Sequence, residues 1–60
     1  MDRLLTYEDA SDEFRWKKVA RNGDLIAESG ESYTRKEDAE RAALRSNPEF
    51  QSVEYEEAEE

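Results

Sequence analysis

The segment Phe14–Tyr33, FRWKKVARNGDLIAESGESY, decides the fold. Two runs in which apolar and polar residues alternate flank the dipeptide Asn22-Gly23. This dipeptide is typical of a two-residue hairpin loop of type I′, in which both loop residues take positive φ angles. The sequence therefore predicts two antiparallel strands joined by a tight turn.

A two-residue loop also predicts which residues of the two strands face each other. The expected pairs are Arg21 with Asp24, Ala20 with Leu25, Val19 with Ile26, and Lys17 with Glu28. Because side chains alternate between the two faces of a strand, one face becomes largely apolar and the other charged. The apolar face collects Phe14, Trp16, Ala20, Leu25 and Ala27. Cross-strand pairs contribute about 0.2–1 kcal/mol each, so we expect them to fix the register.

The remaining segments complete the predicted fold. Arg3–Glu8 alternates like a first strand, and residues 50–55 are a candidate fourth strand. The helix-forming run Arg35–Ser46 follows Thr34, which is spaced from Glu37 as in a capping box. We predict an α+β fold, with a three-stranded antiparallel sheet, extended if the fourth strand forms, and one helix on the Trp16 face. Residues 1–55 form the single domain, and residues 56–60 form an acidic disordered tail.

Residue usage argues against enzymatic chemistry. The chain has no cysteine and no histidine, which removes the usual thiol nucleophile, the usual general base and the common zinc sites. Its carboxylates lack the spacing of a calcium loop or a catalytic pair. We therefore expect no enzymatic activity, no catalytic or metal-ligating residues and no cofactor. An enzyme with a carboxylate-lined site is the weakest hypothesis.

The excess of acidic residues suggests an environment of high salt. Seventeen acidic residues oppose nine basic ones, the net charge is −8, and the acidic residues are spread along the chain. This distribution favours adaptation to a high-salt cytoplasm, because salt screens the repulsion between like charges. No signal peptide is recognisable, and no apolar run approaches the ~20 residues of a membrane helix. We expect a soluble cytoplasmic protein that does not contact a membrane.

The shortness of the chain favours self-association. A domain of 60 residues buries a smaller share of its surface than a larger domain does, and dimerisation is one remedy. Val19 and Ile26 are expected on the sheet face that points away from the helix. We therefore predict a homodimer with these two residues at its interface, and the sequence names no other partner.

A stretch of basic and aromatic residues suggests an alternative function. Four of the nine basic residues fall within seven positions, next to an aromatic side chain. The residues concerned are Arg15, Trp16, Lys17, Lys18 and Arg21. Such a strand can stack on and neutralise a single-stranded nucleic acid. A simpler interpretation pairs Lys17 and Arg21 with acidic residues across the hairpin and buries the tryptophan, and the net negative charge opposes a polyanion.

Three spaced motifs resemble a known family. They are Phe14-Arg15-Trp16, Asn22-Gly23 and Ser29-Gly30-Glu31-Ser32-Tyr33. Over roughly residues 4–46 they are similar to the YegP-like domains of unknown function, although Lys18 and Ser32 depart from the family pattern. The resemblance implies a strand–strand–strand–helix module. Members carry either two tandem copies or a single copy expected to pair with itself, so it implies a homodimer here, and it implies no catalytic residues.

Overall fold

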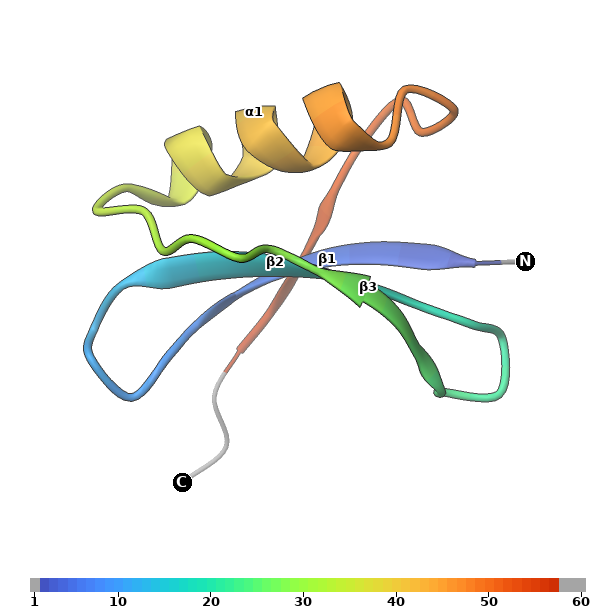
Figure 1. The fold of residues 1–60 in the computed structure, drawn as a ribbon, viewed down its shortest axis with the longest axis horizontal. Helices are drawn as coiled ribbons and strands as arrows, with labels where there is room; N and C mark the ends of the chain where they lie inside the picture. Colours follow the sequence, from blue (N-terminus) through green and yellow to red (C-terminus); the bar gives the residue numbers. More distant parts are fainter. Residues whose placement is uncertain (1, 58–60) are drawn as a thin grey trace.

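A computed structural model describes residues 2–57 as a four-stranded sheet with one helix. The elements are β1 (Arg3–Glu8), β2 (Phe14–Val19), β3 (Leu25–Glu28), α1 (Lys36–Ser46) and β4 (Glu54–Glu56). The strand order is β3-β2-β1-β4, with β4 parallel to β1 and the other pairs antiparallel. Helix α1 lies over one face of the sheet (Figure 1). The predicted α+β fold and element order are confirmed.

The core lies between α1 and the two central strands. Leu4 and Trp16 are 2% and 8% exposed, and they pack against Ala43, which is fully buried. Ala39 is fully buried as well. The small side chains of these alanines let the helix approach the sheet closely. Partly buried residues surround this cluster: Ala27, Tyr33, Ala42, Leu44, Phe50 and Val53.

The hairpin forms at Asn22-Gly23, but its loop differs from the prediction. Gly23 has a φ of +94°, whereas Asn22 is not in the positive-φ region. The Gly23 amide donates to the Ala20 carbonyl at 2.8 Å, and the Ala20 amide donates to the Asp24 carbonyl at 2.7 Å. This geometry is a type I turn followed by a glycine in the left-handed region, which makes a three-residue loop. The predicted type I′ loop is wrong.

The longer loop changes the register next to the turn. Val19 faces Leu25 instead of Ile26, whereas Lys17 faces Glu28 as predicted. Between these two pairs Ile26 is an extra residue of β3, so the strand contains a β-bulge. The predicted pairs Arg21/Asp24, Ala20/Leu25 and Val19/Ile26 are therefore wrong, and Leu25 lies on the face away from α1.

The helix begins at Lys36, one residue later than predicted. Its N-cap is Arg35, which has extended geometry and makes no side-chain capping hydrogen bond. The predicted capping box of Thr34 and Glu37 is therefore wrong. Tyr33 exchanges two backbone hydrogen bonds of 2.7 Å with Phe14, and this pairing keeps the chain extended up to the helix.

The C-terminal part joins the sheet through β4. This strand begins after Phe50 and Val53, which pack on the core instead of pairing with β1. It also includes Glu56, the first residue of the predicted tail. Residues 58–60 of that tail lie outside the described residues. Within the described chain, α1 is too short and too polar to cross a membrane.

Candidate interaction surface

The sheet face opposite α1, called the open face below, draws side chains from all four strands. Residues paired across neighbouring strands point to the same face. The register therefore assembles this face from Arg3, Leu5, Tyr7, Arg15, Lys17, Val19, Leu25, Glu28, Glu54 and Glu56. No helix or further strand of residues 2–57 covers it (Figure 1). A partner can reach the sheet here.

Ion pairs cover the β4 side of the open face. The Arg3 guanidinium donates to both carboxylate oxygens of Glu54, at 2.8 and 3.2 Å, and this contact lowers the pKa of Glu54. The Lys17 ammonium lies 2.8 Å from a Glu56 carboxylate oxygen. Leu5 faces both Lys17 and Glu54, and it is only 4% exposed. Polar side chains therefore shield the apolar centre of this face.

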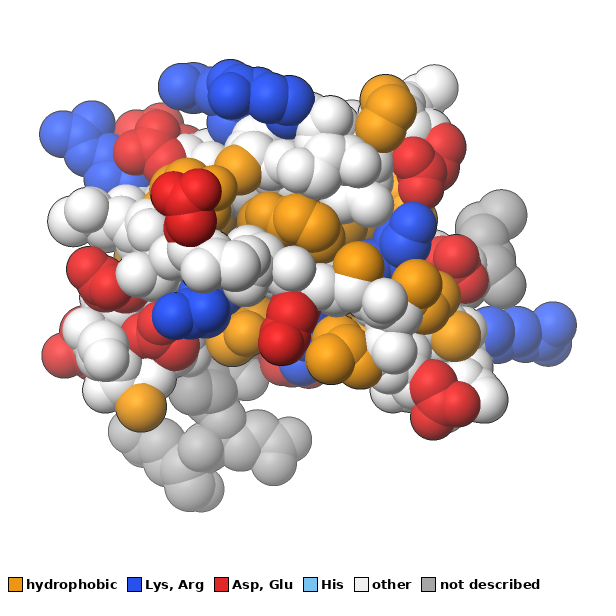
Figure 2. All heavy atoms as spheres, viewed as in Figure 1, with side chains coloured by type: hydrophobic (Ala, Val, Ile, Leu, Met, Phe, Trp, Pro, Cys, Tyr) orange, Lys and Arg blue, Asp and Glu red, His pale blue; other side chains and the backbone are white. Residues whose placement is uncertain are grey.

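The β3 side of the open face is apolar and exposed. Leu25 and Ile26 are 55% and 48% exposed, and they are the exposed large hydrophobic residues of the described chain. The bulge places both of them opposite the half-buried Val19. Figure 2 shows hydrophobic side chains at the surface over β3. We call Val19, Leu25 and Ile26 the apolar patch; it contains both residues predicted at a dimer interface.

The residues of the predicted nucleic-acid strand are divided between two faces. Trp16 belongs to the core and is 8% exposed, and Lys18 points to the same face of the sheet. Arg15 and Lys17 point to the open face. Arg21 is exposed in the hairpin loop. These five residues therefore do not form a continuous basic and aromatic surface.

Three of the four cations in this group are already neutralised. Arg15 donates to Asp9 at 2.9 Å, and the Lys18 ammonium lies 3.2 Å from a Glu49 oxygen. Lys17 pairs with Glu56. These partners come from other parts of the chain, up to 39 residues away. Short-range sequence patterns therefore cannot predict them. The predicted ion pairs of Lys17 with Glu28 and of Arg21 with Asp24 do not form among residues 2–57.

Asp9 organises the turn between β1 and β2. One oxygen of its carboxylate accepts from the amides of Ser11 and Glu13, at 2.8 and 3.0 Å. The other accepts from Arg15 at 2.9 Å. The amide of Glu13 and then the Arg15 guanidinium lower the pKa of Asp9. This arrangement stabilises the turn.

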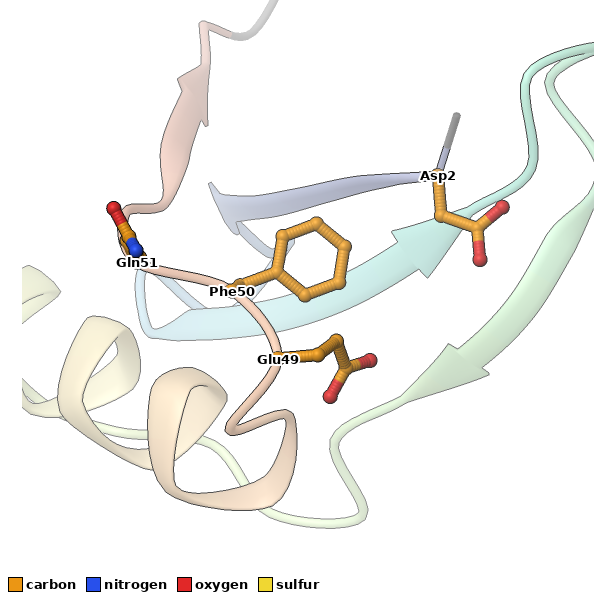
Figure 3. A pocket seen from close by; sticks show the side chains of 4 residues that line it. All are labelled: Asp2, Glu49, Phe50 and Gln51. Carbon is orange, nitrogen blue, oxygen red and sulfur yellow. The ribbon is translucent and has the colours of Figure 1, made fainter.

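A shallow hollow lies where the chain enters β1. Its volume is about 530 Å³, and it is lined by Asp2, Glu49, Phe50 and Gln51. Figure 3 shows the Phe50 ring directed toward Asp2. The pKa of Glu49 is lowered by its own backbone amide and by Lys18, which pairs with it. The Glu49 carboxylate at the rim of this hollow is therefore held by an ion pair with β2.

The described residues assemble no metal centre. In residues 2–57, no three carboxylates lie close enough together to hold a metal ion. Every buried side-chain nitrogen and oxygen of that part of the chain has a hydrogen-bond partner. The open face with its apolar patch is therefore the candidate site.

Comparison with known proteins places the chain in a family. Residues 9–44 match the family model described as Domain of unknown function (DUF1508). The chain belongs to this family. The match includes the three motifs that resemble YegP-like domains, so that prediction is confirmed.

A solved structure supports the fold of this DUF1508 domain. The protein from Haloferax volcanii determined by NMR in solution is 31% identical, with a TM-score of 0.66. The similarity covers 87% of this chain and 90% of that one. A search of curated proteins finds no match.

In this DUF1508 domain the motif residues hold the fold together. Trp16 fills the core, and its amide donates to the Ser29 hydroxyl at 3.3 Å. That hydroxyl donates in turn to the Glu31 carbonyl at 2.9 Å. Gly23 closes the hairpin, and Tyr33 pairs with Phe14. The contacts of these residues are structural.

Proposed function

We propose that this DUF1508 domain is a small homodimeric interaction module that acts by binding and not by catalysis. The observation that carries the proposal is the apolar patch, in which Leu25 and Ile26 are about half exposed on a face whose other exposed residues are charged. Neighbouring apolar side chains at the surface of a soluble domain commonly mark an association site. A second copy of the same chain is the simplest partner for such a patch.

A two-fold axis through the apolar patch provides a physical arrangement for the dimer. It would bring Val19, Leu25 and Ile26 of one copy against the same residues of the other, as in an isologous interface. The ion pairs Arg3–Glu54 and Lys17–Glu56 would form a polar rim beside this apolar centre. Burying the exposed halves of four large aliphatic side chains would contribute several kcal/mol, on the basis of about 1.5–3 kcal/mol for each fully buried side chain.

Sedimentation equilibrium tests the dimer. At high micromolar concentration in molar KCl, the parent chain of 7.0 kDa should have twice that mass. The double variant Leu25→Ser/Ile26→Ser should return to the mass of the monomer with an unchanged circular dichroism spectrum. Arg41→Ser, an exposed substitution on α1, is the matched control and should remain dimeric. A monomeric parent chain under these conditions would rule the dimer out.

We further propose that the domain works in a cytoplasm of high ionic strength. The net charge of −8 supports this, because so acidic a surface repels itself when salt is low. The absence of cysteine suits a reducing compartment. A melting temperature that increases between 0.1 and 2 M KCl is the result that this proposal requires.

Single-stranded nucleic-acid binding through the Arg15–Arg21 segment receives less support. It needs accessible aromatic rings next to free cations. Trp16 is 8% exposed, and most of the neighbouring cations are paired with carboxylates. Titrating a labelled single strand at several salt concentrations separates the two functions. Tight binding that weakens as salt rises would favour the nucleic-acid hypothesis.

A further inference from the structure

The outer edge of β3 borders the open face and presents backbone groups for pairing. In the sheet order β3 is an edge strand that pairs only with β2 (Figure 1). Edge strands usually carry lysine, proline or other devices that discourage pairing with another strand. The sequence of β3, Leu-Ile-Ala-Glu, has neither lysine nor proline, although the strand is only four residues long and contains the bulge at Ile26. The edge can therefore accept a short strand beside its two exposed side chains, Leu25 and Ile26.

The two ends of β3 carry carboxylates without a cation. Glu28 faces Lys17 across the sheet, but the Lys17 ammonium pairs with Glu56. Among the described residues, the carboxylate of Asp24, directly before the strand, accepts a hydrogen bond only from the Asn22 side-chain amide, at 3.1 Å. Among residues 2–57, neither carboxylate has a lysine or arginine nitrogen within 4.0 Å. Two negative charges therefore flank two exposed apolar side chains.

This charge pattern selects among possible partners. Antiparallel pairing of β3 with β3 of a second copy, centred on Ile26, would bring Asp24 level with Glu28 of the other copy, although the bulge turns these two carboxylates to opposite faces of the sheet. The two like charges at each end of the paired strands would still repel each other. Charge therefore opposes pairing with a second copy, whereas cationic side chains at the same positions would be attracted.

We propose that the β3 edge binds an extended segment of a partner protein in which basic residues flank an apolar centre. The backbone of the segment continues the sheet by hydrogen bonding to the edge of β3. Its apolar side chains contact Leu25 and Ile26, and its lysine or arginine side chains reach Asp24 and Glu28. This interaction goes beyond the homodimer, because the backbone of the segment pairs with the edge of the sheet. It shares Leu25 and Ile26 with the proposed dimer, so the two interactions exclude each other on one copy.

Fluorescence polarisation with a labelled peptide tests the proposal on the full chain. The probe is Arg-Thr-Val-Thr-Val-Arg, and its control has glutamate in place of both arginines. At 0.1 M KCl the first peptide should bind and the second should not. The double variant Asp24→Asn/Glu28→Gln should bind the probe at least threefold more weakly, since exposed ion pairs are individually weak. Glu37→Gln/Glu40→Gln on α1 makes the same change in net charge and should bind like the parent.

Three results would overturn the proposal. They are no binding of the probe at millimolar concentration, equal binding by the two double variants, and amide chemical-shift changes outside Asp24–Glu28 and its flanks. If the Asp24→Asn/Glu28→Gln variant loses its fold, Glu28→Gln alone should show a smaller weakening in the same direction. The dimer proposal fails separately, because a monomeric parent that still binds the probe refutes only the dimer. Since both proposals use Leu25 and Ile26, the probe is titrated at protein concentrations at which sedimentation shows the monomer, and no binding there refutes only the edge site.

Discussion

Gly23 and Gly30 are the two glycines of the chain, and they differ in backbone conformation. Gly23 has a φ of +94°, whereas Gly30 is outside the left-handed region. A Cβ atom would meet nothing within 4 Å at either position. Gly23→Ala should therefore lower the free energy of unfolding by about 1 kcal/mol through backbone strain alone. Urea denaturation measures this change.

Gly30→Ala is the matched control for that experiment. It removes a glycine without forcing an alanine into a left-handed conformation, so its effect should be neutral or slightly stabilising. A Gly23→Ala midpoint equal to that of the parent would contradict the turn geometry.

Asp9 should make stability depend on pH in the acid range. Its pKa lies below the ordinary value of 3.8, chiefly because it accepts from the Glu13 amide and then from Arg15. A group whose pKa is lower in the folded state stabilises the fold fully above its unfolded pKa. That stabilisation is lost as the pH falls below about 4 through the folded value. Asp9→Asn should therefore lower the melting temperature at pH 7 and flatten its decline in acid.

Glu57→Gln is the control for the acid titration. Glu57 is exposed, and no ion pair to it forms among residues 2–57. This variant should follow the parent curve from pH 7 to pH 2. If Asp9→Asn behaves in the same way as Glu57→Gln, the turn does not depend on the Asp9 carboxylate.

At the scale of elements, the hairpin shows what local sequence can predict. The Asn-Gly dipeptide suits a type I′ loop and also a type I turn that ends on a left-handed glycine. The two loops differ in length by one residue, and the extra residue Ile26 compensates for that difference farther along the strand. For this reason the predicted Lys17/Glu28 pairing is confirmed, while the three predicted pairs between the bulge and the turn are wrong.

The start of the helix shows what a local sequence motif cannot predict. Thr34 and Glu37 have the spacing of a capping box, yet Arg35 is the N-cap. The backbone pairing of Tyr33 with Phe14 holds the preceding segment against β2. That contact joins residues far apart in the chain, so it could not be read from the capping motif. The burial of Ala39 and Ala43, which lie four residues apart on one face of α1, requires only helical periodicity.

The close packing of α1 on the sheet can be tested at Ala43. This residue is fully buried against Leu4 and Trp16. Ala43→Leu should lower the free energy of unfolding by about 1–3 kcal/mol, because extra methylene groups in a filled core force the helix away from the sheet. Ser46→Ala, at an exposed position of the same helix, should be nearly neutral. Guanidinium denaturation of both variants makes the comparison, and a neutral Ala43→Leu would contradict the packing.

At the scale of the whole molecule, charge should control stability. Seventeen acidic residues against nine basic ones create a repulsion that salt screens. The burial of apolar surface also becomes more favourable at high salt, because excluded salts make exposed surface more costly. Exposed pairs such as Arg3–Glu54 weaken in salt, but each contributes only ~0–1 kcal/mol. The melting temperature should therefore rise from 0.1 to 2 M KCl, as measured by circular dichroism.

A variant with fewer charges provides the control for the salt series. Replacing the exposed residues Glu31, Glu37 and Glu57 by glutamine removes three negative charges. This variant should melt higher than the parent at 0.1 M KCl and gain less from added salt. A flat or falling melting temperature for the parent would remove the proposal of salt adaptation.

The candidate site was only partly predictable at this scale. Strand alternation predicts that Val19 and Ile26 lie on the open face. The exposure of Leu25 depends on a bulge that the sequence pattern does not predict. The cations of the basic strand were recognised, but their partners Glu49 and Glu56 lie far away in the chain. Short-range pattern predicts which face a residue occupies, and the whole fold decides which charges meet on it.

The parallel pairing of β4 with β1 has a consequence for the synthesis of this protein. The Thr6 hydroxyl donates to the carbonyl of Glu54, a residue 48 positions later. At the usual rate of about 5–20 residues per second, a ribosome needs roughly 2–10 s to add that many residues. Throughout that interval β1 has no neighbour on one side, and Leu5 lacks the carboxylates that later cover it. A nascent chain therefore exposes an edge and an apolar side chain to chaperones that the finished domain conceals.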